Sequence, residues 1–364
     1  MRQVAINGAI LALSLAGALY TWQHRDDEPS DDTKVAMYQA AKGDVQKITW
    51  KADDLTVTLE HKKDASGEYT WVSTHEEIKK AAPPVAPGDT DAPAVPEVAG
   101  EVEIKESAFL GNDAAAKLYD AFSPLMALRE LAQDPSADPK TFGFDAPKAT
   151  LTVDKGGQAI ELLLGAETYG SRDRYVKQGD KVFLVDDQDL RPLQYGKTRL
   201  VERALQPFAE KDLESVLVRD AAGTSVNFVQ KNREDREKAY WARDATPDTK
   251  DEIGATWLDK LIKVRAQGYP NADEIPATPT LMFSYTATGR KDGAAQSWTV
   301  EIVKNEADGE FYAKSSYDRA TVKLTKTLAS EAVDDLTAAL SGTSPIPMSP
   351  GGPSPEAPVP PVQP

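Results

Sequence analysis

Three short segments near the start of the chain alternate apolar and polar residues. They cover residues 45–50, 55–60 and 69–72. Successive side chains of a strand point to opposite faces, so a period of two predicts a three-stranded meander. Four further segments between residues 149 and 186 repeat the alternation. The first part of the chain is therefore expected to be rich in β-structure.

Apolar residues recur at helical spacing between these two groups of strands. The stripe spans residues 116–128, with Asn112 or Asp113 as the expected N-cap and Pro124 as the expected site of a kink. A second, shorter helix is expected after the last strand, capped by Asp187 or Asp189. The first part of the chain thus has the order βββ-α-ββββ-α.

The same order recurs after about residue 200. Strand patterns and two helical stripes follow one another at 213–218, 225–229, 240–243, 251–266 (helix), 281–285, 298–303, 311–314, 322–324 and 330–340 (helix). The predicted fold class is α+β: a β-rich ectodomain of two copies of a βββ-α-ββββ-α unit, with one N-terminal transmembrane helix. The alternative is two unrelated α+β domains that share an order.

The N-terminus begins with nineteen uncharged residues from Val4 to Trp22. As a helix this run is about 28 Å long, close to the thickness of one hydrocarbon core. Arg2 favours the cytoplasmic side, which places the rest of the chain outside. The residues expected to span the bilayer are Val4, Ile6, Ile10, Leu11, Leu13, Leu15, Leu19 and Trp22.

A cleaved signal peptide is the alternative for this segment. Ala16, Gly17 and Ala18 form an A-x-A-like site after an Ala-rich stretch. Both interpretations export the chain. The retained anchor is favoured because the apolar run continues past Ala18 to an aromatic border.

Proline-rich stretches and polar segments divide the chain further. The expected organisation is an anchor or signal peptide at 1–24, a flexible linker at 25–38, and a first α+β repeat at 39–200 with a Pro-rich insertion at 81–98. A second repeat at 201–341 and a disordered Pro-rich tail at 342–364 complete it.

The charge and the composition exclude some classes of partner. The chain has 42 Lys and Arg against 58 Asp and Glu, a net charge of -16, and no cysteine. Nucleic acid requires a basic face, so it is not an expected partner. Thiolate metal sites and disulfides are also excluded.

The motifs of catalysis and nucleotide binding are missing from the sequence. There is no G-x-x-x-x-G-K-[ST], no G-x-G-x-x-G after a strand and no H-E-x-x-H. The acidic run at 186–189 lacks the glycine and distal glutamate of an EF-hand, so helix capping is favoured. We therefore expect no catalytic residues, no cofactor and no metal, and a protein that is not an enzyme.

One local motif stands out in the first repeat. Phe142, Gly143, Phe144, Asp145 and Pro147 form an F-G-F-D-x-P turn, which an alternating strand follows. Further on come L-L-L-G, ending at Gly165, then Y-V at 175–176 and V-F-L-V at 182–185. A packing role is favoured for the two glycines and the aromatic residues. A ligand pocket with Asp145 as a polar contact is the alternative.

These motifs resemble the bacterial domain-of-unknown-function family 4340 (DUF4340), whose pattern usually has Leu where Phe144 stands. The resemblance is clear over about residues 37–218 and weak beyond. It implies a membrane-anchored protein, often encoded beside gliding-motility-type ABC exporter components, and no known activity or ligand.

Together these features predict a non-enzymatic, single-pass protein of the bacterial inner (cytoplasmic) membrane, with its bulk periplasmic. Its partners are expected to be the membrane and other envelope proteins, with ABC permease subunits as candidates for an export accessory. The alternative is an anchored or secreted binding module for a glycan or lipid, held in a cleft between the repeats.

Overall fold

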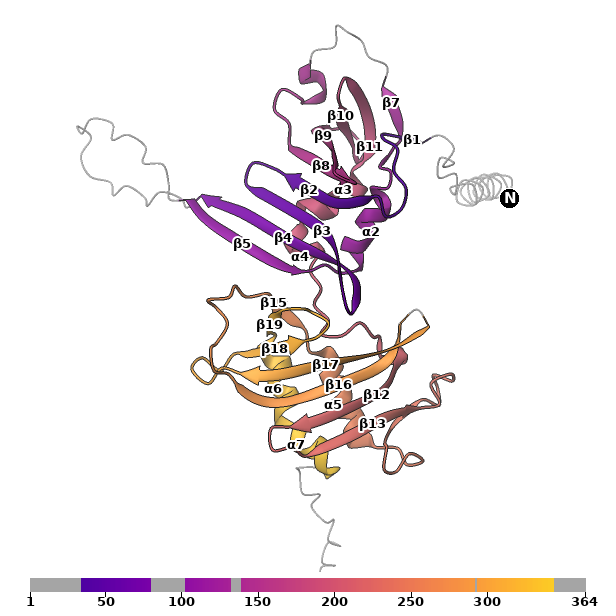
Figure 1. Ribbon diagram of the computed structural model, residues 1–364, viewed down its shortest axis with the longest axis vertical. Helices are drawn as coiled ribbons and strands as arrows, with labels where there is room; N and C mark the ends of the chain where they lie inside the picture. The colour runs from indigo at the N-terminus through magenta and orange to yellow at the C-terminus, as the bar shows by residue number, and fades with distance from the viewer. Residues whose placement is uncertain (1–33, 80–101, 132–138, 292, 344–364) are drawn as a thin grey trace, which may run out of the picture. The chain divides into compact units, whose positions relative to one another are not determined.

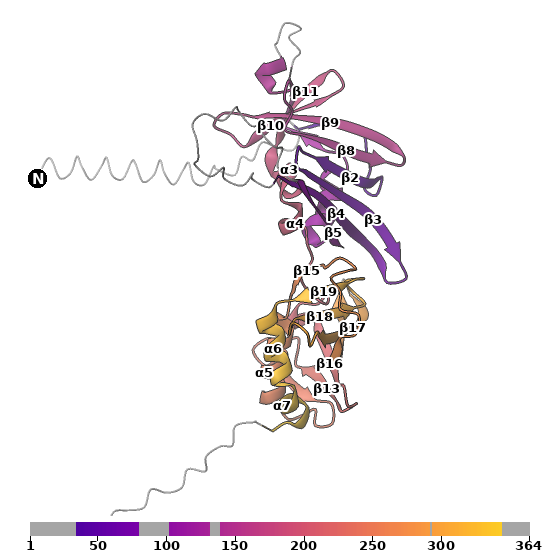
Figure 2. The same ribbon diagram turned by 90° about the vertical axis from the view of Figure 1, so that its left-hand side faces the viewer.

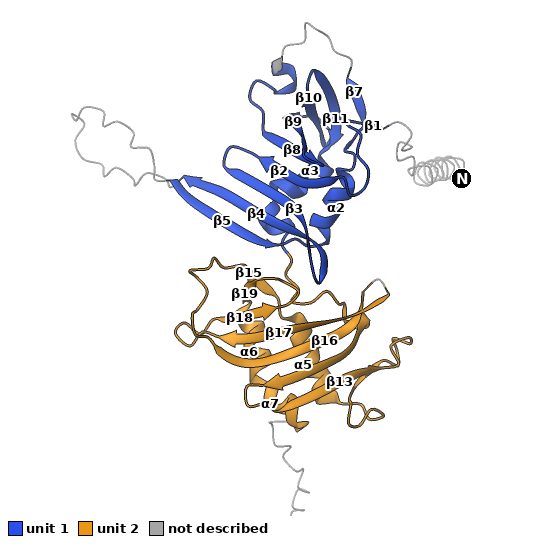
Figure 3. Cartoon of the chain, viewed as in Figure 1, with its two compact units in different colours: residues 1–201 blue, residues 202–364 orange. Residues whose placement is uncertain are grey.

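The computed structural model describes residues 34–79, 102–131, 139–291 and 293–343 (Figure 1). The chain divides into two compact units, unit 1 up to Val201 and unit 2 from Glu202 (Figure 3). Both are rich in β-strands with a few helices, which confirms the β-rich α+β class. Each unit is described by itself below.

Unit 1 is built on one sheet of nine strands. Its hydrogen-bonded order is β5-β4-β3-β2-β8-β9-β10-β11-β7. The strands are β2 (Val45–Lys51), β3 (Leu55–Asp64), β4 (Gly67–Lys79), β5 (Val102–Leu110), β7 (Arg129–Leu131), β8 (Ala149–Lys155), β9 (Gln158–Glu167), β10 (Asp173–Gln178) and β11 (Lys181–Asp186). The pairing of β2 with β8 joins the meander to the later strands, with Ile48 opposite Val153.

Two strands of this sheet do not follow from the sequence pattern. The expected meander has three strands, but β5 adds a fourth beside β4, with Val72 opposite Phe109. The three-residue β7 closes the other edge against β11. Both lie in segments whose apolar residues are too few or too exposed to show a clear period.

The start of unit 1 lies before the predicted boundary at residue 39. Strand β1 (Val35–Ala36) pairs with β6 (Met126–Ala127) in a small second sheet. Met37 and Tyr38 are buried, and the Tyr38 hydroxyl donates to the Phe122 carbonyl at 2.7 Å. The last residues of the predicted linker at 25–38 are therefore part of the folded unit.

The helices of unit 1 are short. They are α2 (Asp113–Ala121), the 3₁₀ turn η2 (Pro139–Phe142), α3 (Asp187–Gln194) and α4 (Gly196–Arg199). Asn112 caps α2 by accepting hydrogen bonds from two backbone amides, as expected for an N-cap. The helix ends before Pro124, which lacks an N–H, and residues 126–127 form β6 instead of the last predicted turn.

Unit 2 contains one sheet of eight strands. Its order is β14-β13-β12-β16-β17-β18-β19-β15. The strands are β12 (Leu213–Asp220), β13 (Ser225–Lys231), β14 (Tyr240–Arg243), β15 (Ala266–Gly268), β16 (Thr280–Lys291), β17 (Ala294–Lys304), β18 (Phe311–Ser315) and β19 (Thr321–Leu324). Here β12 pairs with β16 as β2 does with β8.

The helices of unit 2 lie on one face of its sheet, as Figure 2 shows for α5, α6 and α7. They are η3 (Glu210–Asp212), α5 (Glu252–Lys263), α6 (Lys326–Asp334) and α7 (Leu336–Ser341). Asp251 caps α5 through the Gly254 amide. The single helix predicted at 330–340 is thus two helices, which meet at Asp335.

Alternation along the strands separates a buried face from a more polar one. Trp257, Phe228 and Phe283 form an aromatic centre between α5 and the sheet of unit 2. On the opposite face, Thr286 and Thr299 face each other across β16 and β17 with their hydroxyls 3.1 Å apart. The amphipathic pattern of the strands therefore positions one core under each set of helices.

The predicted membrane segment lies outside the described residues. Among the residues that are described, no helix has both the length and the apolar character needed to cross a bilayer. The N-terminal anchor and its alternative, the cleaved signal peptide, stay predictions, as do the Pro-rich insertion at 81–98 and the tail beyond residue 343.

Candidate functional site

The F-G-F-D-x-P motif forms the turn that leads from η2 into β8. Gly143 has φ +72°, a left-handed conformation that favours glycine, and its amide donates to the Lys140 carbonyl at 3.1 Å. A Cβ on Gly143 would lie 2.8 Å from the Ala166 amide nitrogen. The turn therefore packs its backbone directly on the end of β9.

Gly165 provides the other side of this contact. A Cβ at Gly165 would lie 2.1 Å from the Phe142 carbonyl oxygen and 2.9 Å from the Phe144 ring. The register between β9 and β10 shifts here, because Arg174 faces Glu167 while Val176 faces Leu164. Gly165 thus lies at a bulge where a second backbone approaches closely.

The aromatic residues of the motif complete the packing. The Phe142 ring lies 4.9 Å from that of Tyr175, at a steep angle, and 6.0 Å from that of Phe144. Asp145 and Pro147 are exposed on the turn. The structure therefore brings together the two glycines and the two phenylalanines of the predicted site, and leaves Asp145 and Pro147 at the surface.

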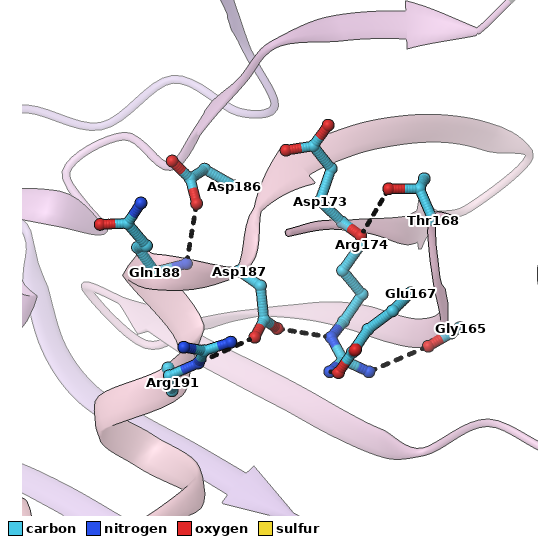
Figure 4. Close-up of polar contacts among 9 residues, drawn as sticks. All are labelled: Gly165, Glu167, Thr168, Asp173, Arg174, Asp186, Asp187, Gln188 and Arg191. Atoms are coloured by element: carbon cyan, nitrogen blue, oxygen red, sulfur yellow. Dashed lines mark hydrogen bonds and ion pairs between the residues drawn. The ribbon is translucent and has the colours of Figure 1, made fainter. Parts of the chain in front are cut away.

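A buried ion pair lies next to Gly165, the residue on which this turn packs (Figure 4). Arg174 on β10 is 2% exposed, and Asp187 at the start of α3 is 1% exposed. Arg174 Nε donates to Asp187 Oδ1 at 2.7 Å. The other guanidinium nitrogens reach the Gly165 carbonyl at 3.1 Å and Glu167 Oε1 at 2.7 Å. One side chain therefore connects β9, β10 and α3.

Two residues of the acidic run at 186–189 have different roles: one caps helix α3 and the other pairs with Arg174. Asp186 is the N-cap of α3, because its Oδ1 accepts from the Gln188 amide at 2.9 Å. The sequence predicted Asp187 or Asp189 in that role. Asp187 is instead used by Arg174, and Arg191 Nε approaches its second oxygen at 3.4 Å. The cap is one residue earlier because Asp187 points into the interior.

The hairpin above this ion pair presents an exposed aromatic residue. Tyr169, between β9 and β10, is fully exposed. The loop around it is internally bonded: the Thr168 amide donates to the Asp173 carbonyl at 2.8 Å, and the Ser171 hydroxyl to Asp173 Oδ2 at 2.8 Å. Tyr169 therefore projects from a loop that is held at its base and across its width.

Unit 2 contains a different buried polar cluster. Asp318, in the turn between β18 and β19, is 0% exposed and accepts a hydrogen bond from the Tyr269 hydroxyl at 3.2 Å. Tyr317 donates to Glu202 Oε2 at 3.1 Å, and the Glu202 carbonyl lies 3.2 Å from the Tyr269 hydroxyl, whose single proton it shares with Asp318. Burial raises the pKa of Asp318 to about 7, and the Tyr269 hydrogen bond offsets part of that rise.

These clusters define what chemistry the described residues offer. Arg174 and Asp187 are buried and paired with each other through Asp187 Oδ1, and Asp318 is enclosed, so none of them faces solvent. Within the described ranges, no group of three His, Asp or Glu converges as metal ligands. The glycines and phenylalanines of the motif thus pack against neighbouring backbone and side chains. In the hairpin next to them, Tyr169 is a fully exposed aromatic residue.

Sequence reasoning missed Arg174, Tyr169 and Asp318. Arg174 directly precedes the Y-V motif, and a charged residue next to apolar strand residues could have indicated a buried ion pair. Tyr169 follows the L-L-L-G strand in a Gly-containing loop, and an aromatic residue there was also a usable signal. Asp318 gave none, because its burial depends on Tyr269, 49 residues away along the chain.

The fold and the motif cluster define a β-rich α+β protein with two sheet-and-helix units. Residues 110–280 match the model of a family described as Domain of unknown function (DUF4340). This confirms the resemblance to this family that the motifs predicted, although the match begins at residue 110 and not near residue 37, and continues beyond residue 218 to the start of β16. No curated protein and no solved structure matched the chain.

Proposed function

We propose that this chain is a non-enzymatic binding protein, and that the Tyr169 loop is where it contacts partner proteins of the envelope. The observation that carries the proposal is a fully exposed tyrosine on an internally bonded loop. Tyrosine is enriched among residues that dominate binding energy, and a loop that is ordered beforehand loses little entropy on binding.

The surroundings of this loop support the same proposal. The hairpin base is fixed by Arg174, whose guanidinium binds Glu167, Gly165 and Asp187. Because Arg174, Asp187 and Gly165 are buried and bonded to one another, with only Glu167 exposed, they serve to hold the loop. Binding residues are often found on loops that a rigid scaffold positions, which is the arrangement here.

The test uses a photo-crosslinking amino acid at position 169 in the full chain, expressed in its own cells. We expect capture of an ABC-type permease subunit, identified by mass spectrometry. The matched control is the same probe at Tyr195, which is 55% exposed and lies between α3 and α4. Equal capture from both positions, or none from position 169, contradicts the proposal.

We also propose that the N-terminal segment is a retained membrane anchor and that the folded units are exported. The support is the uncharged run from Val4 to Trp22 with Arg2 ahead of it. Alkaline carbonate should leave the full chain in the membrane fraction, and protease added outside should digest the units. A mature N-terminus at Leu19 would instead establish cleavage after Ala18.

We infer further that the two units are copies of one ancestral unit. From β2 and β12 onward, the strands of the two sheets correspond in order, except that unit 1 has the additional edge strand β5 before its helix and the short strand β6 after it. The register also shifts at the same place, between the first and third residues of β2 and of β12. Shared irregularities are stronger support than shared order, because a bulge is a specific local feature.

An experimental structure of each unit tests the duplication. The equivalent strands and the two helical regions should superpose in chain order with the bulges of β2 and β12 aligned. A superposition that requires a different strand order contradicts it.

A further inference from the structure

Strand β5 is the long edge strand of the unit 1 sheet among the strands that the structure describes. It runs over nine residues, and among the described strands it pairs with β4 alone. The other sheet edges are much shorter: β7 and β15 have three residues each and β14 has four. An exposed edge presents unpaired N–H and C=O groups, so a long one is a template for pairing with another strand. Figure 1 shows β5 along this margin.

The direction of the backbone groups along this edge follows from two hydrogen bonds. The Gly111 amide donates inward to the Thr70 carbonyl on the β4 side, and the next amide, of Asn112, donates to the Leu200 carbonyl. In an antiparallel ladder successive residues alternate between the two sides. The even-numbered residues of β5 therefore direct their N–H and C=O groups away from β4.

The side chains of the edge are unusual for a protected strand. Ile104 is 58% exposed and Val102 is 47% exposed, and both lie on the same face of the strand. On the opposite face are Glu103 and Lys105, which form a 3.7 Å ion pair within the chain. The edge thus offers two apolar residues followed by Glu106 on one face, and one charge of each sign at positions 103 and 105 on the other.

We propose that β5 pairs antiparallel with β5 of a second copy of this chain, about a twofold axis at Ile104. Ile104 then faces Ile104 of the second copy as a hydrogen-bonded pair, which suits the outward direction of its backbone groups. On the same face, Val102 of each copy lies opposite Glu106 of the other copy. Glu103 faces Lys105 of the other copy twice, at the non-hydrogen-bonded positions where side chains are closest.

The charge pattern selects this register over its neighbours. A twofold axis at residue 103 places Glu103 opposite itself, and an axis at residue 105 places Lys105 opposite itself. An axis at residue 106 does the same for Glu106. Like charges directly opposite each other destabilise a pair of strands. The axis at Ile104 gives opposite charges at both flanking positions and an isologous, closed dimer.

Cysteine crosslinking tests the position of the axis, because the natural chain contains no cysteine. In the full chain in detergent, Ile104→Cys should form a disulfide-linked dimer, since opposed hydrogen-bonded residues have Cα atoms about 5.5 Å apart. Glu106→Cys is the matched control on the same face. Its two copies would lie roughly 13 Å apart in this register, too far for a disulfide.

Charge reversal tests the pairing itself. Glu103→Lys and Lys105→Glu each place like charges opposite each other, so each variant alone should dimerise at least tenfold more weakly in sedimentation experiments. Mixing the two variants should restore dimers, because the lysine introduced in one chain then faces the glutamate introduced in the other. Both variants lack the ion pair within the chain, so restored pairing reports the contact between copies.

Three results would overturn the proposal. The first is a chain that sediments as a monomer at every concentration. The second is a Glu106→Cys variant that crosslinks as fast as Ile104→Cys, which indicates a different register. The third is a mixture of the two charge variants that dimerises no better than each variant alone.

Discussion

In each unit an ion pair links a hairpin to the helix that follows the last strand of the sheet. The positive and negative residues exchange places between the two units, and the pair is buried in unit 1 but largely exposed in unit 2. In unit 1 the cation is on the strand, where Arg174 of β10 binds Asp187 of α3 at 2.7 Å. In unit 2 the cation is on the helix, where Lys326 of α6 binds Glu310, just before β18, at 3.3 Å. Lys326 is 52% exposed, whereas Arg174 is 3% exposed at its side chain.

The difference indicates how the two connections contribute to stability. Exposed ion pairs contribute little, because water and salt screen them. A buried pair is costly to break, since the remaining partner is left as an uncompensated charge. Unit 1 therefore depends on its ion pair, while unit 2 depends on apolar packing of its closing helices, which include buried Ala329 and Ala332.

The largest effect is expected from Arg174→Ala. The substitution leaves the buried Asp187 with only the more distant and partly exposed Arg191, at 3.4 Å, and should destabilise unit 1 by about 3 kcal/mol, the lower end for a broken buried pair. Hydrogen exchange measured by mass spectrometry should show faster exchange in β9, β10 and α3. The double variant with Asp187→Ala should lose less than the sum of the two single variants. An additive result would show that the pair is not coupled.

The next effect comes from the buried carboxyl of unit 2. The pKa of Asp318 is raised to about 7, above the roughly 3.9 of an unfolded Asp. The folded state therefore holds this proton more tightly, so its stabilising contribution is complete below about pH 4 and is lost as pH rises through about 7.

Relative to Asp318→Asn, which does not titrate, unit 2 should lose about 2–3 kcal/mol between pH 5 and pH 8. Urea unfolding at a series of pH values measures this difference. Parallel curves for the two proteins would show that Asp318 does not titrate in this range.

Gly165→Ala tests the backbone contact beneath the motif turn. The added methyl group would meet the Phe142 carbonyl at 2.1 Å, so β9 or the turn must move, at a cost of about 1–3 kcal/mol. The matched control is Gly268→Ala in unit 2, where no atom lies within 4 Å of the new Cβ. Equal melting temperatures for the two variants would contradict this explanation.

The smallest effect is expected from Lys326→Ala. It removes the exposed pair with Glu310, which should cost about 0–1 kcal/mol. The Lys323 side chain still lies 3.3 Å from Glu310, so the carboxylate keeps a partner. A loss comparable to that of Arg174→Ala, measured by denaturant unfolding, would remove the distinction between the two connections.

Much of the fold could be predicted because it depends on local periodicity. The strands of the meander and the four strands after α2 follow alternation, and Asn112 follows the preference for N-caps. Strand β5 could not be recognised in this way. Its apolar residues, Val102 and Ile104, are exposed, and it is formed by pairing with β4.

The candidate site was predictable in part for the same reason. Gly143 and Gly165 are visible because glycine marks close approach of two backbones, and the structure places both at such a contact. The Arg174–Asp187 pair joins residues 13 positions apart across a strand and a helix. No periodic pattern encodes that distance, so charge alone did not reveal which carboxylate is buried.

The hairpin with its bonded base has a consequence for how sequences of this kind can diverge. The groups that fix the hairpin, Arg174 and Asp187, lie below the tip, where Tyr169 is fully exposed. Gly170 beside it has φ +80°, a left-handed conformation that favours glycine, so the freedom to vary lies in the Tyr169 side chain. Substitutions at position 169 therefore change the surface that the loop displays while the sheet beneath it stays constant.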